Sequence, residues 1–135
     1  MTMPRPLRVL YVEDNSMVRE ITLELLEQNQ RQVAAFATAE DALREFKQQT
    51  FDIVITDVSL PAMSGLDLAR NILDIQPSVP IIVATGYALD LSQGTWGPKV
   101  RVILKPFDSQ QIDALIADLC ADVSPDTTST STLPS

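Results

Sequence analysis

Short apolar runs alternate with longer stretches of mixed polarity along this chain. Four of these runs are rich in β-branched residues and almost continuous, which is typical of parallel strands that are buried on both faces of a sheet. A weaker run over residues 32–36 predicts an edge strand. The four strong runs cover residues 7–12, 52–56, 80–85 and 100–104.

Helical patterns lie between the strands, with apolar side chains at intervals of three and four residues. Each pattern begins at a residue whose side chain can accept a hydrogen bond from the first turn of a helix. The predicted N-caps are Asn15 or Ser16, Thr38, Ser64 and Asp108. The apolar residues expected to share a face are Val18, Ile21 and Leu25 in the first helix, Ala42, Leu43 and Phe46 in the second, Leu66, Ala69 and Leu73 in the third, and Ile112, Leu115, Ile116 and Leu119 in the last.

The alternation of strands and helices predicts a single α/β domain with a doubly wound parallel sheet, because parallel strands need crossover connections. In this chain of 135 residues we expect an N-terminal extension over 1–6, the domain over 7–121 and a disordered tail rich in Ser, Thr and Pro over 122–135. Glycine and proline residues between 94 and 98 leave room only for a shortened fourth helix around 88–93.

Charge and the rare residue types narrow the functions that this chain can have. Ten basic against 18 acidic residues give a net charge of −8, so the attraction to phosphate that drives nucleic-acid binding is missing. No histidine is present, which excludes imidazole catalysis and histidine metal sites. A single cysteine, Cys120, and the lack of any signal peptide or membrane-spanning run favour a cytoplasmic protein without a membrane partner.

Polar side chains follow the strong strands, at the points where the strands end. In a parallel sheet these carboxyl ends lie along one edge, where ligands bind. Each residue alone has an ordinary explanation, as a helix cap, a turn residue, a strand terminus or a surface lysine. Together they place three carboxylates, one hydroxyl and one ammonium at this edge, which suits Mg²⁺ and phosphoryl transfer to an aspartate. The residues are Glu13, Asp14, Asp57, Thr85 and Lys105.

Four motifs along the chain, given below in sequence order, resemble those of response regulator receiver domains, the CheY-like domains of two-component signal transduction. The resemblance covers residues 7–120 and implies a flavodoxin-like sheet with strand order 2-1-3-4-5. It also implies a cis peptide bond within the last motif, between its lysine and its proline. The motifs are Val12-Glu13-Asp14, Asp57 with Pro61 and Gly65, Ala84-Thr85-Gly86, and Lys105-Pro106-Phe107.

The resemblance implies a role for each residue at the strand ends. Asp57 is expected to be the phosphoacceptor, with Thr85 as the switch hydroxyl and Lys105 as the phosphate contact. Mg²⁺ is the expected cofactor, held by side-chain and backbone oxygen atoms. Its expected ligands are Asp14, Asp57, the backbone carbonyl of Ser59 and, through a water molecule, Glu13.

A histidine kinase or a histidine phosphotransfer protein is the phosphoryl donor that the resemblance implies. Phosphorylation of Asp57 would switch a protein-interaction surface toward a downstream protein that the sequence does not identify. The chain would catalyse only its own phosphorylation and dephosphorylation, as a monomer or a weak phosphorylation-dependent dimer. The initial Met and the polar tail favour a single-domain regulator with no attached output domain, although a receiver cut from a hybrid kinase or a longer regulator fits as well.

Two features depart from the family pattern. The position three residues before Lys105 usually carries Tyr or Phe, but here it is Val102, so we expect Tyr87 to serve as the switch aromatic. The shortened fourth helix is the other departure. Within the same stretch, Trp96 is expected either to pack against the sheet or to anchor a partner.

Two other functions stay open. An aspartate phosphatase of the haloacid dehalogenase kind also uses an aspartate and Mg²⁺ at a strand end, but it needs an acid two residues after the nucleophile, where this chain has Ser59. A receiver-like scaffold that no longer uses phosphate is favoured by Val102 and opposed by the complete acidic set. Repeated turnover of a phosphomonoester would indicate the phosphatase, and failure to form a phosphoryl adduct would indicate the scaffold.

Overall fold

Strands and helices alternate along the chain, as the hydrophobic pattern predicts. The computed structural model describes residues 6–87, 91, 96, 97 and 99–120. The strands are β1 (Arg8–Val12), β2 (Gln32–Phe36), β3 (Ile53–Asp57), β4 (Ile81–Thr85) and β5 (Val100–Leu104). The helices are α1 (Ser16–Glu27), α2 (Ala39–Gln48), α3 (Gly65–Ile75) and α4 (Ser109–Leu119), with a single 3₁₀ turn, η1 (Gln28–Gln30), after α1.

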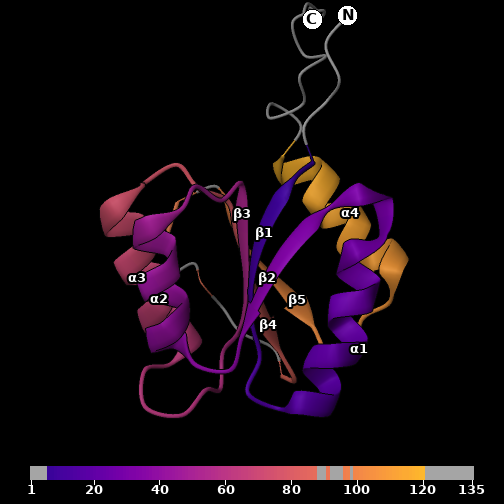
Figure 1. Cartoon of the computed structure of the whole chain (residues 1–135), viewed down its shortest axis with the longest axis horizontal. Coiled ribbons are helices and arrows are strands. Elements are labelled where there is room, and N and C mark those ends of the chain that lie inside the picture. Colours follow the sequence, from indigo (N-terminus) through magenta and orange to yellow (C-terminus); the bar gives the residue numbers. More distant parts are fainter. Residues whose placement is uncertain (1–5, 88–90, 92–95, 98, 121–135) are drawn as a thin grey trace, which may run out of the picture.

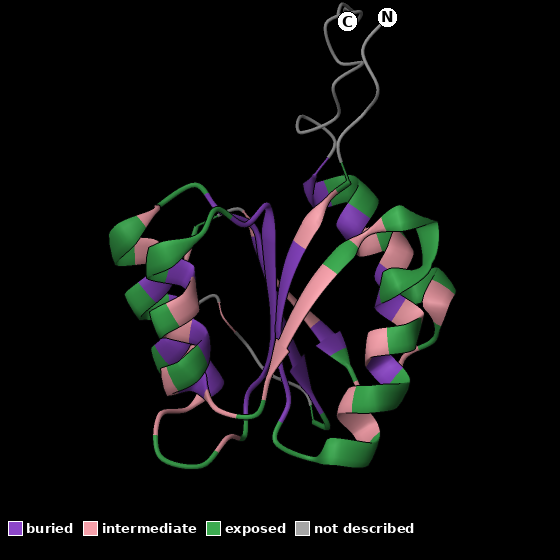
Figure 2. Cartoon of the chain, in the orientation of Figure 1, coloured by how far each residue is buried: buried purple, intermediate pink, exposed green. Residues whose placement is uncertain are grey.

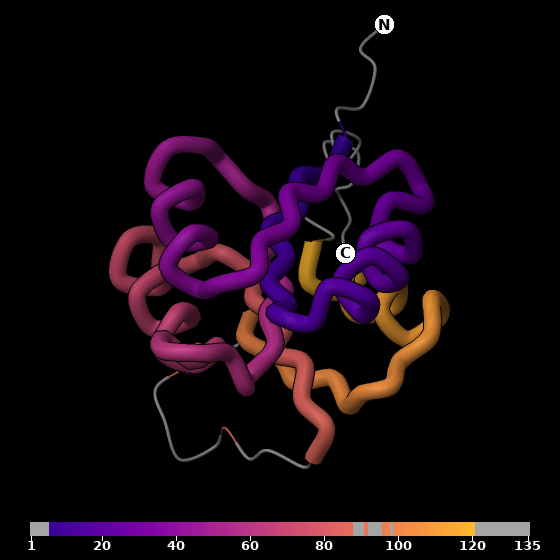
Figure 3. Tube along the Cα trace, turned by 60° about the horizontal axis from the view of Figure 1, so that its bottom comes forward, coloured from indigo at the N-terminus to yellow at the C-terminus, as the bar shows by residue number. Residues whose placement is uncertain are grey.

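The five strands form one parallel sheet in the order β2-β1-β3-β4-β5, so the predicted fold class is confirmed. Each predicted strand differs from the observed one by at most one residue at either end. Helices α2 and α3 cover one face of the sheet, and α1 and α4 cover the other (Figure 1). The strands run in the same direction, so all of their carboxyl ends meet at one edge, which is turned toward the viewer in Figure 3.

The central strands are buried on both faces, which explains their nearly continuous apolar sequences. Every residue of β3 and β4 is buried, whereas β2 at the edge is only half-buried (Figure 2). Alternate residues of β1 enter two separate cores. Leu10 packs on the side of α2 and α3, and Val9 packs on the side of α1 and α4. The strand ends are therefore held from both sides.

The predicted N-caps are confirmed at all four described α-helices. In each case a side-chain oxygen accepts the backbone N–H of the residue three positions later, which satisfies a donor that the helix leaves unpaired. The pairs are Asn15 with Val18 at 3.0 Å, Thr38 with Asp41 at 3.1 Å, Ser64 with Asp67 at 3.1 Å, and Asp108 with Gln111 at 2.9 Å.

The apolar face expected for α1 packs on the sheet only in part, through Leu25. Thr22 and Leu26 are the buried residues of this helix, while Val18 and Leu25 are half-buried and Ile21 is 62% exposed. The buried Thr22 lies beside Tyr11 of β1, with which its side chain forms a hydrogen bond. Burial raises the pKa of Tyr11, so its hydroxyl keeps its proton.

Helix α3 shows a smaller difference of the same kind. Leu68, Ala69 and Ile72 are fully buried, whereas Leu66 and Leu73 are half-buried at the border of the core. A helix that lies on a sheet buries the central line of its apolar stripe most deeply. The faces expected for α2 and α4 are confirmed, with Ala42, Phe46, Ile112, Ile116 and Leu119 buried and Leu43 and Leu115 packed against the cores.

Three expectations lie largely or wholly outside the described residues: the extension over 1–6, the shortened helix around 88–93 and the tail over 122–135. The boundaries of the domain accordingly stay predictions. In the part of the chain that the structure describes, no helix combines the length and the apolar character needed to cross a membrane.

The difference in burial predicts different consequences for two leucines in the strands. Replacing Leu10 by alanine removes a fully buried side chain from β1, and we expect the free energy of unfolding to fall by about 2–5 kcal/mol. The same change at Leu104, which is 52% exposed, should lower it by less than about 1 kcal/mol. Urea unfolding followed by circular dichroism measures both, and equal losses would contradict the described core.

Candidate active site at the carboxyl edge

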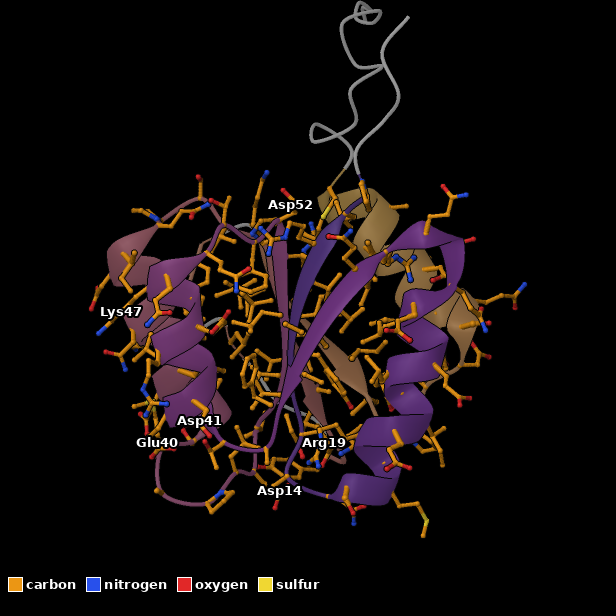
Figure 4. All side chains as sticks on the ribbon, in the orientation of Figure 1. Asp14, Arg19, Glu40, Asp41, Lys47 and Asp52 are labelled. Atoms are coloured by element: carbon orange, nitrogen blue, oxygen red, sulfur yellow. The ribbon has the colours of Figure 1, made fainter. Side chains whose placement is uncertain are left out.

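Three carboxylates meet at the carboxyl edge of the sheet. Glu13 and Asp14 follow β1, and Asp57 ends the neighbouring strand β3. One oxygen atom from each of the three lies within 4.8 Å of the others. Glu13 and Asp57 are buried, whereas Asp14 is exposed and lies at the lower edge of the sheet in Figure 4.

Lys105 reaches this cluster from the loop after β5. Its Nζ donates hydrogen bonds to Glu13 Oε1 at 3.1 Å and to Asp57 Oδ2 at 3.3 Å. Burial lowers the pKa of Lys105, but the hydrogen bond to Glu13 and the negative charge of Asp57 outweigh burial, so its pKa is raised above the usual value. The side chain therefore remains a cation at neutral pH and offsets part of the repulsion among the carboxylates.

Thr85 ends β4, beside the strand that carries Asp57. Its side chain is buried, and its Oγ1 accepts the backbone N–H of Tyr87 at 3.3 Å. Ala84, which precedes it, pairs with Asp57 in the register of the sheet. A hydroxyl that accepts one bond keeps its own proton for donation, so Thr85 can donate to a group carried by its neighbour.

The backbone of Asp57 is packed closely by helix α3. A Cβ atom at Gly65 would lie 1.8 Å from the Asp57 carbonyl oxygen, so only glycine fits at the start of this helix. The Gly65 N–H donates to Val58 O at 2.9 Å, and the Thr56 hydroxyl donates to the Asp57 carbonyl at 3.0 Å. These contacts hold the end of β3 in place behind the Asp57 carboxylate.

Two further side chains tie the loops of the site to nearby helices, and the sequence analysis singled out neither of them. Arg19 of α1 donates to the Glu13 carbonyl at 2.8 Å. Glu40 of α2 accepts the backbone N–H of Met63 at 3.1 Å, in the loop between β3 and α3. No pattern in the sequence indicates either contact, because each joins a helix side chain to a backbone atom of another segment.

The structure brings together four of the residues expected at the site, namely Glu13, Asp14, Asp57 and Lys105. The cis peptide bond between Lys105 and Pro106 is confirmed. Thr85 lies on the strand next to Asp57, while the carbonyl of Ser59 as a metal ligand stays a prediction.

The structure also describes three residues linked to the departures from the family pattern, namely Val102, Tyr87 and Trp96. Val102 is half-buried in β5, and Tyr87 is 55% exposed. Trp96 packs partly against the core, with the guanidinium of Arg70 4.3 Å from the centre of its ring. Trp96 is thus partly buried beside α3, while its expected packing against the sheet and its role as a partner anchor stay predictions.

The donor atoms of the cluster suit a hard divalent cation. They are carboxylate oxygens without nitrogen or sulfur ligands, a set that Mg²⁺ prefers while it keeps several water molecules. Lys105 supplies one positive charge against three carboxylates, so the site retains a negative charge that such an ion would neutralise. The residues therefore fit the magnesium expected from the sequence.

The sequence profile of the response regulator receiver domain matches residues 9–117. The chain belongs to this family. The acidic cluster, Lys105 and Thr85 all fall within the matched segment, and receiver domains bind Mg²⁺ in an acidic pocket of this kind. Receivers interact with histidine kinases or with phosphotransfer partners.

Curated relatives match this chain over different shares of their own length. The chain is 30% identical over 102 residues to the response regulator receiver protein CpdR of Brucella abortus. This alignment covers 74% of this chain and 85% of CpdR. It is 30% identical over 116 residues to the two-component response regulator PhoP of Pseudomonas aeruginosa, covering 80% of this chain but 49% of PhoP. The receiver thus spans most of one relative and about half of the other.

Solved structures share the same fold over nearly the whole receiver. A receiver domain protein from Clostridium thermocellum superposes with a TM-score of 0.77 at 26% identity, over 87% of this chain and 96% of that one. The receiver domain of the sensor histidine kinase PA1611 from Pseudomonas aeruginosa has a TM-score of 0.76 at 24% identity, over 86% and 98% of the two chains. The PA1611 structure contains a magnesium ion coordinated in its active-site cleft.

Because α3 packs closely behind Asp57, replacing Gly65 or Gly86 by alanine should have unequal effects on the free energy of unfolding. Gly65→Ala places a methyl group against the Asp57 carbonyl, so we expect a loss of more than about 2 kcal/mol in the free energy of unfolding. Gly86→Ala meets no atom within 4 Å and should change it by less than about 1 kcal/mol. Chemical denaturation measures both; a stable Gly65→Ala protein would show that α3 does not press on this carbonyl.

Proposed function

We propose that this receiver accepts a phosphoryl group on Asp57 from a phosphohistidine of a donor protein, in a reaction that requires Mg²⁺. The observation that carries the proposal is that the Asp57 carboxylate forms a cluster with Glu13 and Asp14 and accepts a hydrogen bond from the Lys105 ammonium. The acceptor thus lies among oxygen atoms that can bind a metal ion and beside a positive charge. In-line phosphoryl transfer requires little more than such positioning and charge neutralisation.

The proposed transfer forms one bond and breaks one bond. A carboxylate oxygen of Asp57 attacks the phosphorus atom, the bond between phosphorus and the histidine nitrogen breaks, and the imidazole leaves with its electron pair and takes up a proton. Lys105 stabilises negative charge on the phosphoryl oxygens, and Thr85 donates a hydrogen bond to one of them. When bound, Mg²⁺ neutralises charge on the phosphoryl oxygens. The proposed metal ligands are Asp14, Asp57, the Ser59 carbonyl and, through water, Glu13.

The hydrogen bond between Thr85 and Tyr87 supports a proposed switch. In the proposed switch the Thr85 oxygen moves toward the phosphoryl group, so the Tyr87 N–H loses its acceptor and the loop after β4 rearranges. Reversing a two-state equilibrium from 1:99 to 99:1 requires about 5.5 kcal/mol, and hydrogen bonds to charged groups contribute roughly 1.5–3 kcal/mol each. Two or three new contacts to the phosphoryl group therefore suffice. Tyr87 is exposed and can change its surroundings without opening the core.

The proposed output is a protein contact rather than a further reaction. In this proposal the receiver catalyses only its own phosphorylation and dephosphorylation, and it acts in the cytoplasm as a monomer or a weak phosphorylation-dependent dimer. Ser59 supports this choice over a phosphatase, because a serine two residues after Asp57 cannot act as the acid that such enzymes use.

An apolar groove beside the site supports a protein as the phosphoryl donor. It has a volume of about 370 Å³ and lies between α1 and the loop after β5, with Lys105 at its lining. Ile21 in this groove is 62% exposed, and the exposed Glu20 and Glu24 lie on the same helix. A small phosphodonor has no use for apolar surface next to the acceptor, whereas a protein with an apolar contact and basic residues around it can bind there. The apolar lining residues are Val18, Ile21, Leu25, Pro106 and Phe107.

The phosphoacceptor role predicts a mass change that depends on one carboxylate. Incubation with acetyl phosphate and Mg²⁺ should add one phosphoryl group to the wild-type chain, and chelation of Mg²⁺ should prevent it. Asp57→Asn should abolish the adduct, whereas the matched control Asp74→Asn, at an exposed position of α3, should retain it. Intact-protein mass spectrometry decides, and an adduct that survives Asp57→Asn would refute the proposed acceptor.

The groove predicts a difference between protein and small-molecule donors. The test uses a phosphorylated histidine phosphotransfer domain that reacts with the wild type. Ile21→Ser should slow this phosphotransfer by about tenfold, because about 1.4 kcal/mol of apolar contact is lost. It should leave labelling by acetyl phosphate unchanged. Ile75→Ser, at an exposed isoleucine of α3 away from the groove, serves as the control for both donors. Equal slowing with both donors would place the effect of Ile21 in the site and not in the groove.

A further inference from the structure

The side chain of Arg19 ties α1 to the turn that carries the acidic pair. Its Nη1 donates to the backbone carbonyl of Glu13 at 2.8 Å, and its backbone N–H donates to the carbonyl of Asn15 at 2.8 Å. The residue is half-buried, and Figure 4 labels it with Asp14 at the carboxyl edge of the sheet. The backbone bond is the first bond of the helix, and the side-chain bond adds a link from α1 to the turn after β1.

The Asp14 carboxylate depends on this turn for its position. Among the residues that the structure describes, none donates a hydrogen bond to the Asp14 side chain or forms an ion pair with it. Its place near Asp57 accordingly follows from the backbone. Because the peptide unit is planar, the direction of the Glu13 carbonyl also sets where Asp14 begins. A Glu13 carbonyl that turned away would move the Asp14 carboxylate out of the cluster.

Other contacts hold the rest of Glu13 but leave its carbonyl to Arg19. The Glu13 N–H donates to the carbonyl of Phe36 at 3.0 Å, and its carboxylate accepts hydrogen bonds from Lys105 and from the Asn15 N–H. The guanidinium thus completes the set of contacts around the first acidic residue. Arginine suits this position because its planar group can donate at a fixed angle from a half-buried stem.

We propose that Arg19 is a positioning residue of the Mg²⁺ site: by holding the Glu13 carbonyl, it keeps the Asp14 carboxylate close enough to Asp57 to share a metal ion. This inference rests on the proposed function only in taking the three carboxylates as the metal site. Arg19 itself contacts neither the metal nor the phosphoryl group in this mechanism.

The positive charge of Arg19 and its hydrogen bond to Glu13 have opposite expected effects on the affinity for Mg²⁺, so the inference can be tested. A positive charge near the cluster repels a cation, so its removal would by charge alone strengthen Mg²⁺ binding. Loss of a group that orients a metal ligand weakens binding, typically by ten- to a hundredfold. The sign of the change on removing Arg19 therefore distinguishes the two effects.

The experiment measures Mg²⁺ binding directly, by calorimetry on the full chain with Mg²⁺ as the titrant. Arg19→Ala should raise the dissociation constant on the order of tenfold, and Arg19→Lys should restore part of the affinity. Arg44→Ala is the matched control, because Arg44 is an exposed arginine of α2 paired with Asp41 and should leave the constant unchanged within about twofold. Thermal melting without Mg²⁺ checks that all three variants are folded.

A second measurement separates positioning from general damage. The half-saturating Mg²⁺ concentration for labelling by acetyl phosphate should rise for Arg19→Ala, while the plateau rate at saturating Mg²⁺ should match that of the wild type. Unchanged or tighter Mg²⁺ binding by folded Arg19→Ala would overturn the inference, and so would a wild-type chain that binds no Mg²⁺. Failure of the proposed function has a different signature: Mg²⁺ binds, and its affinity depends on Arg19, but no phosphoryl adduct forms on Asp57.

Discussion

The repulsion among three carboxylates within 4.8 Å of one another is the constraint on which the rest of this receiver depends. Lys105 offsets part of it through its contacts with Glu13 and Asp57, but one positive charge does not neutralise three negative ones. The charge that remains favours a divalent cation and, through it, a phosphoryl group. The activity proposed for the site thus begins with an electrostatic imbalance that the fold maintains.

The fold can maintain this imbalance because the strands that end at the site are rigid. Every residue of β3 and β4 is buried, and helices pack on both faces of the sheet. Gly65 allows α3 to press against the backbone of Asp57, and Arg19 and Glu40 tie the neighbouring loops to helices. The cost of bringing like charges together is therefore met by burial of apolar surface elsewhere in the domain.

Features that depend on neighbouring residues in the chain could be predicted from the sequence. The strands follow from continuous β-branched runs, and the caps at Asn15, Ser64 and Asp108 follow from residues that bind the backbone three positions later. The gathering of Glu13, Asp14, Asp57 and Lys105 follows from a general property of parallel sheets, that their carboxyl ends meet at one edge. Their expected roles come from the resemblance to receivers; the matching profile shows the family, and the role of each residue stays a prediction.

The sequence by itself determined the strands, the helix caps, the family and the set of charged groups at the edge of the sheet, because each is encoded in local pattern or spacing. Only the tertiary structure decided which face of α1 is exposed, because the packing of this helix on the sheet buries Thr22 and Leu26 and leaves Ile21 exposed. It also decided that Arg19 holds the turn after β1, because this bond joins a side chain to a backbone oxygen six positions away. A bond between a helix side chain and a loop carbonyl leaves no periodic trace in a sequence, and it exists only once the helix has packed.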